Sequence, residues 1–248
     1  MKPKLSIITS VFKGDKFIRP FLEDITKQTY FDKSELLLIN ANSPDNEEPV
    51  IKEYMEKYPN IVYTRLDKDP GVYAVWNMGV KSAAGEYLTN ANLDDRKHIS
   101  HLEQHVTLLE ENPDIDLAYA DVYMTTVPNE TFEKCTPTSV YHFPEYSYHH
   151  LLRYNMPHNN PVWRKSIHDR FGLFREDLVS AGDFEMWLRA ASSGSQFKKI
   201  ELTLSLYYHN PEGISTKPET LNKAIEEVNN VRDQYLNKSD YRDYAMWK

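Results

Sequence analysis

The sequence predicts an α/β fold in which a mainly parallel sheet is flanked by helices and followed by a C-terminal helical extension. Three observations predict it. Apolar runs of strand length alternate with helically periodic segments as far as residue 125. Polar residues gather where the predicted strands end. The chain has 248 residues, of which 40% are hydrophobic, which is enough for one large domain. Alternating strands and helices favour a parallel sheet covered on both faces.

The predicted strands of the first half are short apolar runs rich in β-branched residues. They are residues 5–12, 35–40, 61–65, 86–90 and 117–125. The intervening segments repeat apolar residues at helical spacing, as Phe17, Phe21 and Ile25 do. The predicted helices are residues 17–25, 44–58, 73–84 and 99–111. Gly85 is a plausible stop for the third of them.

The second half of the chain is less regular. Residues 126–165 contain five prolines and are predicted to be rich in loops. A helix is expected at 184–193, a strand at 202–209 and a terminal helix at 218–236. We expect one domain over residues 1–216. We expect residues 217–248 to be a helical extension that packs on this domain or on a partner subunit, which makes a homodimer possible.

Composition excludes several classes of function. The formal net charge is 29 − 37 = −8, so the chain lacks the basic surface that nucleic-acid binding requires. The single cysteine, Cys135, excludes a disulfide framework and a cysteine-based zinc cluster. The apolar run at the N-terminus is too short for a signal peptide or a membrane span. We therefore expect a cytoplasmic protein, with a peripheral place at the inner face of the membrane as the alternative.

Asp94 and Asp95 directly follow a predicted buried strand. Two adjacent carboxylates repel each other, so a cation is expected between them and a ligand. Mg²⁺ and Mn²⁺ prefer such oxygen ligands together with phosphate oxygens. The alternative interpretation is a helix N-cap, because aspartate favours the start of a helix.

Other polar residues could contribute to the same edge of the sheet. Gly71 lets the backbone turn or approach a ligand, and Asn77 could hydrogen-bond a phosphate or a base. Asp183 begins a predicted helix, where it could be a general base or an N-cap. His209 ends an apolar strand and could be a metal ligand or a structural histidine. His158 lies in a polar loop and could touch a substrate.

Several familiar motifs are missing from the sequence. It contains no GxGxxG fingerprint and no GxxxxGK[ST] phosphate loop. It also contains no GxSxG nucleophile elbow. A dinucleotide-binding enzyme, a P-loop NTPase and an α/β-hydrolase are therefore not indicated.

A set of motifs follows in order along the chain: LSIITSVF at 5–12, QTY at 28–30, GVYAVWNMGV at 71–80, AGEYL at 84–88, NLDD at 92–95, GDFEMWLR at 182–189 and the strand before NPEGIS at 210–215. Taken in this order, the motifs resemble family 2 glycosyltransferases of the GT-A fold. The resemblance covers residues 4 to 216. It implies a Rossmann-like sheet and an inverting transfer from a nucleotide-activated sugar.

The resemblance also implies roles for individual residues. Asp183 would be the catalytic base, and Asp95 would ligate Mn²⁺ or Mg²⁺, with His209 as a further metal ligand. The nucleotide sugar would contact Thr9, Phe12, Asn40, Asn42, Asp69, Gly71, Asn77 and Asp94. His158 and Trp163 would contact the acceptor, which is a glycan, a lipid-linked sugar or a protein glycan. The expected donor is a UDP-sugar, with a GDP- or dTDP-sugar as the alternative.

The sequence departs from the family pattern at two places. The aspartate-rich run after the second strand is NANSPD at 40–45, and the glutamate that usually precedes Asp183 is replaced by Gly182. Two alternatives therefore stand beside the transferase. One is a non-catalytic nucleotide- or sugar-binding module, and the other is a nucleotidyltransferase.

Overall fold

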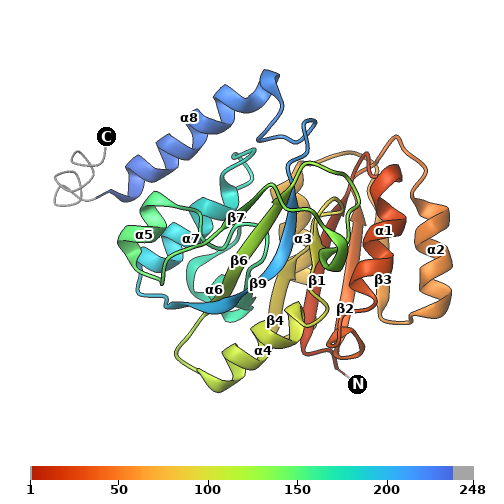
Figure 1. Ribbon diagram of the computed structural model, residues 1–248, viewed down its shortest axis with the longest axis horizontal. Helices are drawn as coiled ribbons and strands as arrows, with labels where there is room; N and C mark the ends of the chain where they lie inside the picture. The colour runs from red at the N-terminus through yellow and green to blue at the C-terminus, as the bar shows by residue number, and fades with distance from the viewer. Residues whose placement is uncertain (1, 237–248) are drawn as a thin grey trace.

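The computed structural model describes residues 2–236 and, within them, shows a nine-stranded sheet between two layers of helices (Figure 1). The strands are β1 (Leu5–Val11), β2 (Ser34–Asn40), β3 (Ile61–Arg65), β4 (Tyr87–Asn90), β5 (Arg96–Lys97), β6 (Leu117–Thr125), β7 (Ser139–Tyr141), β8 (Val162–Arg164) and β9 (Phe197–Tyr208). Their order in the sheet is β3-β2-β1-β4-β8-β6-β9-β5, and β7 pairs with β6.

The sheet is parallel in its first half and mixed in its second. The pairs β1–β2, β1–β4 and β2–β3 are parallel, and β6 is parallel to β9. In contrast, β8 is antiparallel to both β4 and β6, and β5 is antiparallel to β9. The expectation of loops over 126–165 was wrong for β7 and β8. Three-residue strands are too short to show the alternation that identifies a strand in a sequence.

The helices are α1 (Asp15–Ile25), α2 (Glu48–Lys57), α3 (Val72–Ser82), α4 (His101–Glu111), α5 (Tyr148–Arg153), α6 (Ser166–Phe171), α7 (Gly182–Ser192) and α8 (Pro218–Tyr235). Two short 3₁₀ turns lie at Phe31–Lys33 and Phe132–Lys134. The predicted helices of the first half are all present, with shifted ends. The six-residue helices α5 and α6 were not predicted, because a helix of this length barely completes its apolar repeat.

Alternating side chains of the strands reach two separate cores. Leu36 and Leu38 pack with α1, α2 and α4 on one face of the sheet. Leu37 and Ile8 pack on the other face with α3, α5, α6 and α7. Successive side chains of a strand point to opposite faces, and helices on both faces make the whole strand apolar. Because helices cover both faces of the sheet, the ends of the strands are where polar side chains can meet a ligand.

Helix α8 lies across the second layer, next to α7 (Figure 1). Val231 is buried among the residues of that core, whereas Ile225 is 51% exposed. The described part of the extension therefore packs on its own domain. The expected helical extension also included residues 237–248, which lie outside the described residues. No helix within residues 2–236 is long and apolar enough to cross a membrane.

Candidate active site

Unpaired polar atoms mark the edge where β1, β2 and β4 end. The side-chain atoms Thr9 Oγ1, Asn40 Nδ2 and Asn90 Oδ1 are buried and have no hydrogen-bond partner. Parallel strands place their carboxyl ends at one edge, which is where open α/β sheets bind ligands. A buried polar atom without a partner costs about 1–3 kcal/mol. A bound ligand that pairs with these atoms would remove that cost.

Two loops beside this edge are tied together. The Glu47 side chain accepts hydrogen bonds from the Gly14 N–H at 2.8 Å and from the Ser43 hydroxyl at 2.7 Å. Ser43 Oγ in turn accepts from the Lys13 N–H at 2.9 Å. The loop after β1 and the loop after β2 therefore form one unit. Sequence reasoning identified the run at 40–45 without giving Ser43 a role, and it did not single out Glu47, which belongs to no motif.

Asp94 and Asp95 lie between β4 and the short strand β5. Strand β5 pairs with β9, so the two aspartates lie beside the end of β9. Asp95 Oδ1 accepts from the Tyr208 N–H at 3.1 Å, and Asp94 Oδ2 accepts from Asn210 Nδ2 at 2.9 Å. The N-cap interpretation of this pair was wrong, because helix α4 begins only at His101, after β5.

Asp95 is 5% exposed, and its burial together with the charge of Asp94 raises its pKa to about 7. A cation would relieve both effects. Proteins usually hold Mg²⁺ with one or two carboxylates, and phosphate oxygens of a substrate supply further ligands. This pair of aspartates therefore fits Mn²⁺ or Mg²⁺. Within residues 2–236 no three His, Cys, Asp or Glu side chains are grouped to hold a metal. The exposed His209 is thus not joined with the aspartates, and its neighbour Asn210 is the residue that contacts Asp94.

Two buried cationic side chains, Arg96 and Lys97, directly follow Asp95 in the chain. Arg96 donates to the carbonyl oxygens of Leu93 and Asp95, at 2.9 and 2.6 Å. Lys97 donates to the carbonyl oxygen of Asn159 at 3.2 Å. Burial lowers the pKa of Lys97 to about 8. Arg96 holds the turn that carries the aspartates, and the positive charges of Arg96 and Lys97 favour ionisation of the buried Asp95 carboxylate.

Asp183 lies in the first turn of α7, where Ala181 is the N-cap. Its carboxylate accepts from the Tyr73 hydroxyl at 3.3 Å and from Asn155 Nδ2 at 2.8 Å. Burial raises the pKa of Asp183. Tyr73 comes close because residue 182 is glycine, since a Cβ there would lie 2.7 Å from the Tyr73 ring. Neither Tyr73 nor Asn155 was predicted, because their contacts with Asp183 span long stretches of sequence.

One loop connects the two carboxylate sites. Asn155 donates to Asp183 at 2.8 Å, and four residues later the main-chain carbonyl of Asn159 accepts at 3.2 Å from Lys97, two residues after Asp95. Asn159 Oδ1 also accepts from Ser205 Oγ at 3.0 Å. The loop between α5 and β8 therefore spans from the base candidate to the aspartate pair. The cluster of asparagines at 155–160 was the available sequence signal for it.

The remaining nucleotide candidates occupy different surroundings. Phe12 is 40% exposed, and Asn42 is exposed with a left-handed backbone at φ 55°. Asp69 accepts from the Gly71 N–H at 2.8 Å, which shapes the turn into α3. Asn77 is buried and bonds to the main chain of Phe174 in both directions. In this structure Asn77 anchors the segment after α6 and does not reach the edge of the sheet.

The acceptor candidates also differ. His158 is half-buried, and its ring lies 5.4 Å from that of Tyr141 and 4.8 Å from that of Tyr207. Trp163 is 1% exposed, and its Nε1 donates to His168 Nε2 at 3.0 Å. The expectation that Trp163 contacts the acceptor does not fit this position, because β8 directs its ring into the core. Periodicity alone does not show which side of an unpredicted strand is buried.

Comparison with known proteins defines the class. The family model of glycosyl transferase family 2 matches residues 6–175. The chain belongs to this family and is a glycosyltransferase. The matched span includes Asp94 and Asp95 and ends before Asp183. Over 249 residues the chain is 25% identical to the uncharacterized glycosyltransferase MJ1057 of Methanocaldococcus jannaschii, covering 100% of this chain and 85% of the relative.

Solved structures share the fold. TarS 1–349 of S. aureus in complex with UDP-GlcNAc has a TM-score of 0.70 at 18% identity, over 94% of this chain and 72% of that one. The mannosyltransferase PcManGT from Pyrobaculum calidifontis, in complex with GDP-Man and Mn²⁺, has a TM-score of 0.69 at 14% identity, over 92% and 63%. The predicted GT-A fold class is thereby confirmed.

Proposed function

We propose that this glycosyltransferase is an inverting enzyme that uses a nucleoside diphosphate sugar and a divalent cation. The observation that carries the proposal is the pair of carboxylate sites beside one loop: Asp183 at the start of α7 accepts from Asn155, and the strand that follows Asp94 and Asp95 bonds to Asn159 through Lys97. One site suits a metal and a diphosphate, and the other suits a proton acceptor. The family membership favours this proposal over a binding module or a nucleotidyltransferase.

The donor is proposed to lie along the edge formed by β1, β2 and β4. The unpaired atoms of Thr9 and Asn40 would pair with the nucleoside, together with Phe12, Asn42, Asp69 and Gly71 from the surrounding loops. A UDP-sugar is the leading donor, since structures of the same fold hold UDP-GlcNAc or GDP-Man. A GDP- or dTDP-sugar is the alternative.

Asp94 and Asp95 are proposed to hold Mn²⁺ or Mg²⁺ against the donor diphosphate. The ion, when bound, supplies Lewis-acid neutralisation of the charge that develops on the leaving nucleoside diphosphate. Asn92 and the Tyr208 N–H orient Asp95 by donating to its two oxygens, at 3.1 Å each. This leaves lone pairs of both carboxylates for the ion.

Asp183 is proposed to be the general base. It accepts the proton of the acceptor hydroxyl while that oxygen bonds to the anomeric carbon of the donor sugar. The bond from the anomeric carbon to the phosphate oxygen breaks, and its electron pair stays on the phosphate. A single in-line displacement inverts the anomeric centre. Tyr73 and Asn155 donate to the carboxylate and direct it.

The acceptor is proposed to be a glycan or glycoconjugate that enters beside His158. The rings of Tyr141, His158 and Tyr207 form a cluster there, and aromatic faces suit the apolar face of a sugar.

Residues 1–216 are proposed to form the catalytic domain. A cytoplasmic location and a homodimer are retained as predictions.

The test is Asp183→Asn, which keeps the shape of the side chain and removes the base. We expect unchanged donor affinity and a transfer rate lower by about 10²–10⁴-fold. Released nucleoside diphosphate is measured with a panel of donors and sugar acceptors in Mn²⁺. Asp114→Asn, an exposed residue away from the site, is the matched control. Wild-type turnover by Asp183→Asn would refute the role of Asp183.

A further inference from the structure

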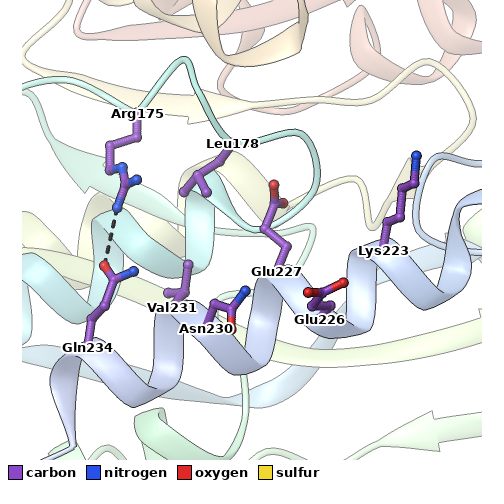
Figure 2. Close-up of a pocket in the computed structure, with 8 residues that line it drawn as sticks. All are labelled: Arg175, Leu178, Lys223, Glu226, Glu227, Asn230, Val231 and Gln234. Carbon is purple, nitrogen blue, oxygen red and sulfur yellow. Dashed lines mark hydrogen bonds between the residues drawn. The ribbon is translucent and has the colours of Figure 1, made fainter.

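Helix α8 hydrogen-bonds to residues 179–181, directly before α7, through the side chain of Glu227. Its Oε2 accepts from the N–H groups of Ser180 and Ala181 at 2.6 and 2.7 Å, and from the Ser180 hydroxyl at 2.9 Å. Its Oε1 accepts from the Val179 N–H at 2.8 Å. Figure 2 shows Glu227 projecting from α8 toward the segment that contains Leu178. Three consecutive backbone donors therefore converge on one carboxylate.

This segment ends where the proposed base begins. Ala181 is the N-cap of α7, and Asp183 lies two residues later. Val179 is 60% exposed, so its side chain does little to hold the segment by packing. Burial of Glu227 opposes its ionisation, but the N–H donors outweigh it and lower the pKa of Glu227. Glu227 is thus a charged acceptor that fixes the backbone next to Asp183.

Other contacts hold helix α8 on the domain, so the backbone that carries Glu227 is fixed in place. Val231 is 1% exposed in the second core. Arg232 donates to the Leu152 carbonyl at 2.7 Å, which joins α8 to α5. The Tyr235 hydroxyl donates to Glu185 at 2.7 Å, which joins it to α7. The helix is anchored one and two turns beyond Glu227 without using the 179–181 segment.

We propose that Glu227 is a positioning residue, which fixes the start of α7 and thereby the placement of Asp183 for proton transfer. The inference rests on the proposed role of Asp183 as the base. It assigns a catalytic purpose to the C-terminal extension, which lies beyond residues 6–175 that match the family model. Glu227 itself acts on Asp183 by way of the main chain at 179–183.

Two measurements that need no substrate test the placement. In Glu227→Ala we expect amide hydrogen exchange at residues 179–181 to accelerate by at least about tenfold, and the NMR signals of Asp183 to shift. Glu226→Ala, a change to the exposed neighbour, is expected to alter neither. Tyr235→Phe loosens α8 at its other contact and is expected to leave the Asp183 signals in place. Unchanged exchange in Glu227→Ala would overturn the proposal.

Turnover then separates positioning from general stability. With UDP-GlcNAc or GDP-mannose and Mn²⁺, nucleotide release by Glu227→Ala is expected to show kcat lower by about 10–100-fold with donor KM within about twofold. Tyr235→Phe is expected to keep kcat. Glu227→Gln retains an oxygen acceptor. If the side chain acts by positioning, the kcat of this variant should lie between those of wild type and Glu227→Ala.

The outcomes distinguish the two proposals. If Glu227→Ala keeps wild-type kcat while its 179–181 amides exchange faster, the positioning role is wrong. The role is also wrong if kcat and donor affinity fall together in Glu227→Ala, or if Tyr235→Phe lowers kcat as much as Glu227→Ala does. If Asp183→Asn keeps its activity in the same assay, the proposed base is wrong, whatever Glu227→Ala shows.

Discussion

Two buried carboxylates of this protein have opposite surroundings. Burial raises the pKa of both Asp95 and Asp183. Asp95 lies beside a second aspartate, so a cation is the favourable partner there. Asp183 faces the neutral donors Tyr73 and Asn155, which orient it without supplying a full charge. Environments that differ in this way separate the roles of neighbouring acids in an active site. We infer a metal ligand in one case and a base in the other.

His168 provides a residue-scale test of the core. It accepts from Trp163 Nε1, and burial lowers its pKa to about 4. The unfolded chain, with a histidine pKa near 6.5, therefore binds more protons between pH 4 and 6.5, so stability is present above this range and is lost as the pH falls through it. We expect the His168 contribution to fall by about 2 kcal/mol between pH 7 and 4.5.

Denaturant unfolding at the two pH values measures this effect. His168→Gln should lose less stability on acidification than wild type, while His149→Gln, at an exposed position, should match wild type. Buried acids that titrate in the same range are common to all three proteins and cancel in the comparison. Equal acid sensitivity of His168→Gln and wild type would contradict the assignment.

At the scale of elements, the pairing of the short strand β5 determines which side chains contact Asp94 and Asp95. The two residues of β5 pair with β9 and bring Asp94 beside Asn210 and Asp95 beside Tyr208. The close crossing of α3 and α7 at Gly182 brings Tyr73 to Asp183. Both contacts depend on elements far apart in the chain. The chemistry of each aspartate is therefore set by what its element meets.

Gly182→Ala tests the crossing of α3 and α7. The added methyl would lie 2.7–2.8 Å from the Tyr73 ring, so the ring or the helix must move. We expect a lower melting temperature and a kcat lower by at least about tenfold, because Asp183 loses its position. Gly79→Ala is the control, since its methyl would lie 2.4 Å from Ile8 within the core. That variant should lose stability and keep kcat, and a similar kcat loss in both would refute the argument.

Over the whole molecule, the two halves contribute different parts of the site. The parallel half, β1 to β4, carries the unpaired polar edge and the aspartate pair. The second half adds β9, the 155–160 loop and α7, which carries Asp183. The family match covers residues 6–175, so it includes the proposed donor site, the 155–160 loop and Tyr73. Asp183 and Glu227 lie beyond it.

A thermal-shift panel tests the proposed donor site as a whole. UDP-, GDP-, dTDP- and CMP-sugars are compared with Mn²⁺ and with EDTA. A ligand at 100 times its Kd adds about 2.7 kcal/mol, which corresponds to several degrees for a chain of this size. We expect one nucleotide to stabilise wild type in Mn²⁺ and not in EDTA. Asp95→Asn should bind that nucleotide with no metal dependence, and a full metal-dependent shift in this variant would exclude Asp95 as a ligand.

Local patterns in the sequence determined much of this protein. Apolar runs and helical periodicity predicted five strands of the first half and the helices between them. Positions after a strand or at the start of a helix made Asp94, Asp95 and Asp183 the candidates. These signals are local, because a side chain's solvent exposure repeats with its own helix or strand. The family motifs, which are also contiguous, predicted the fold class correctly.

The tertiary structure alone decided the partners of those residues. The pairing of β5 with β9, the burial of Trp163 and the attachment of Asn77 to Phe174 each join distant parts of the chain. The support of Asp183 by Asn155 and of its helix by Glu227 does so too. Such contacts leave no periodic trace, because they depend on how completed elements pack. The identities of the acidic residues were therefore readable in the sequence, whereas their charges and orientations came from packing.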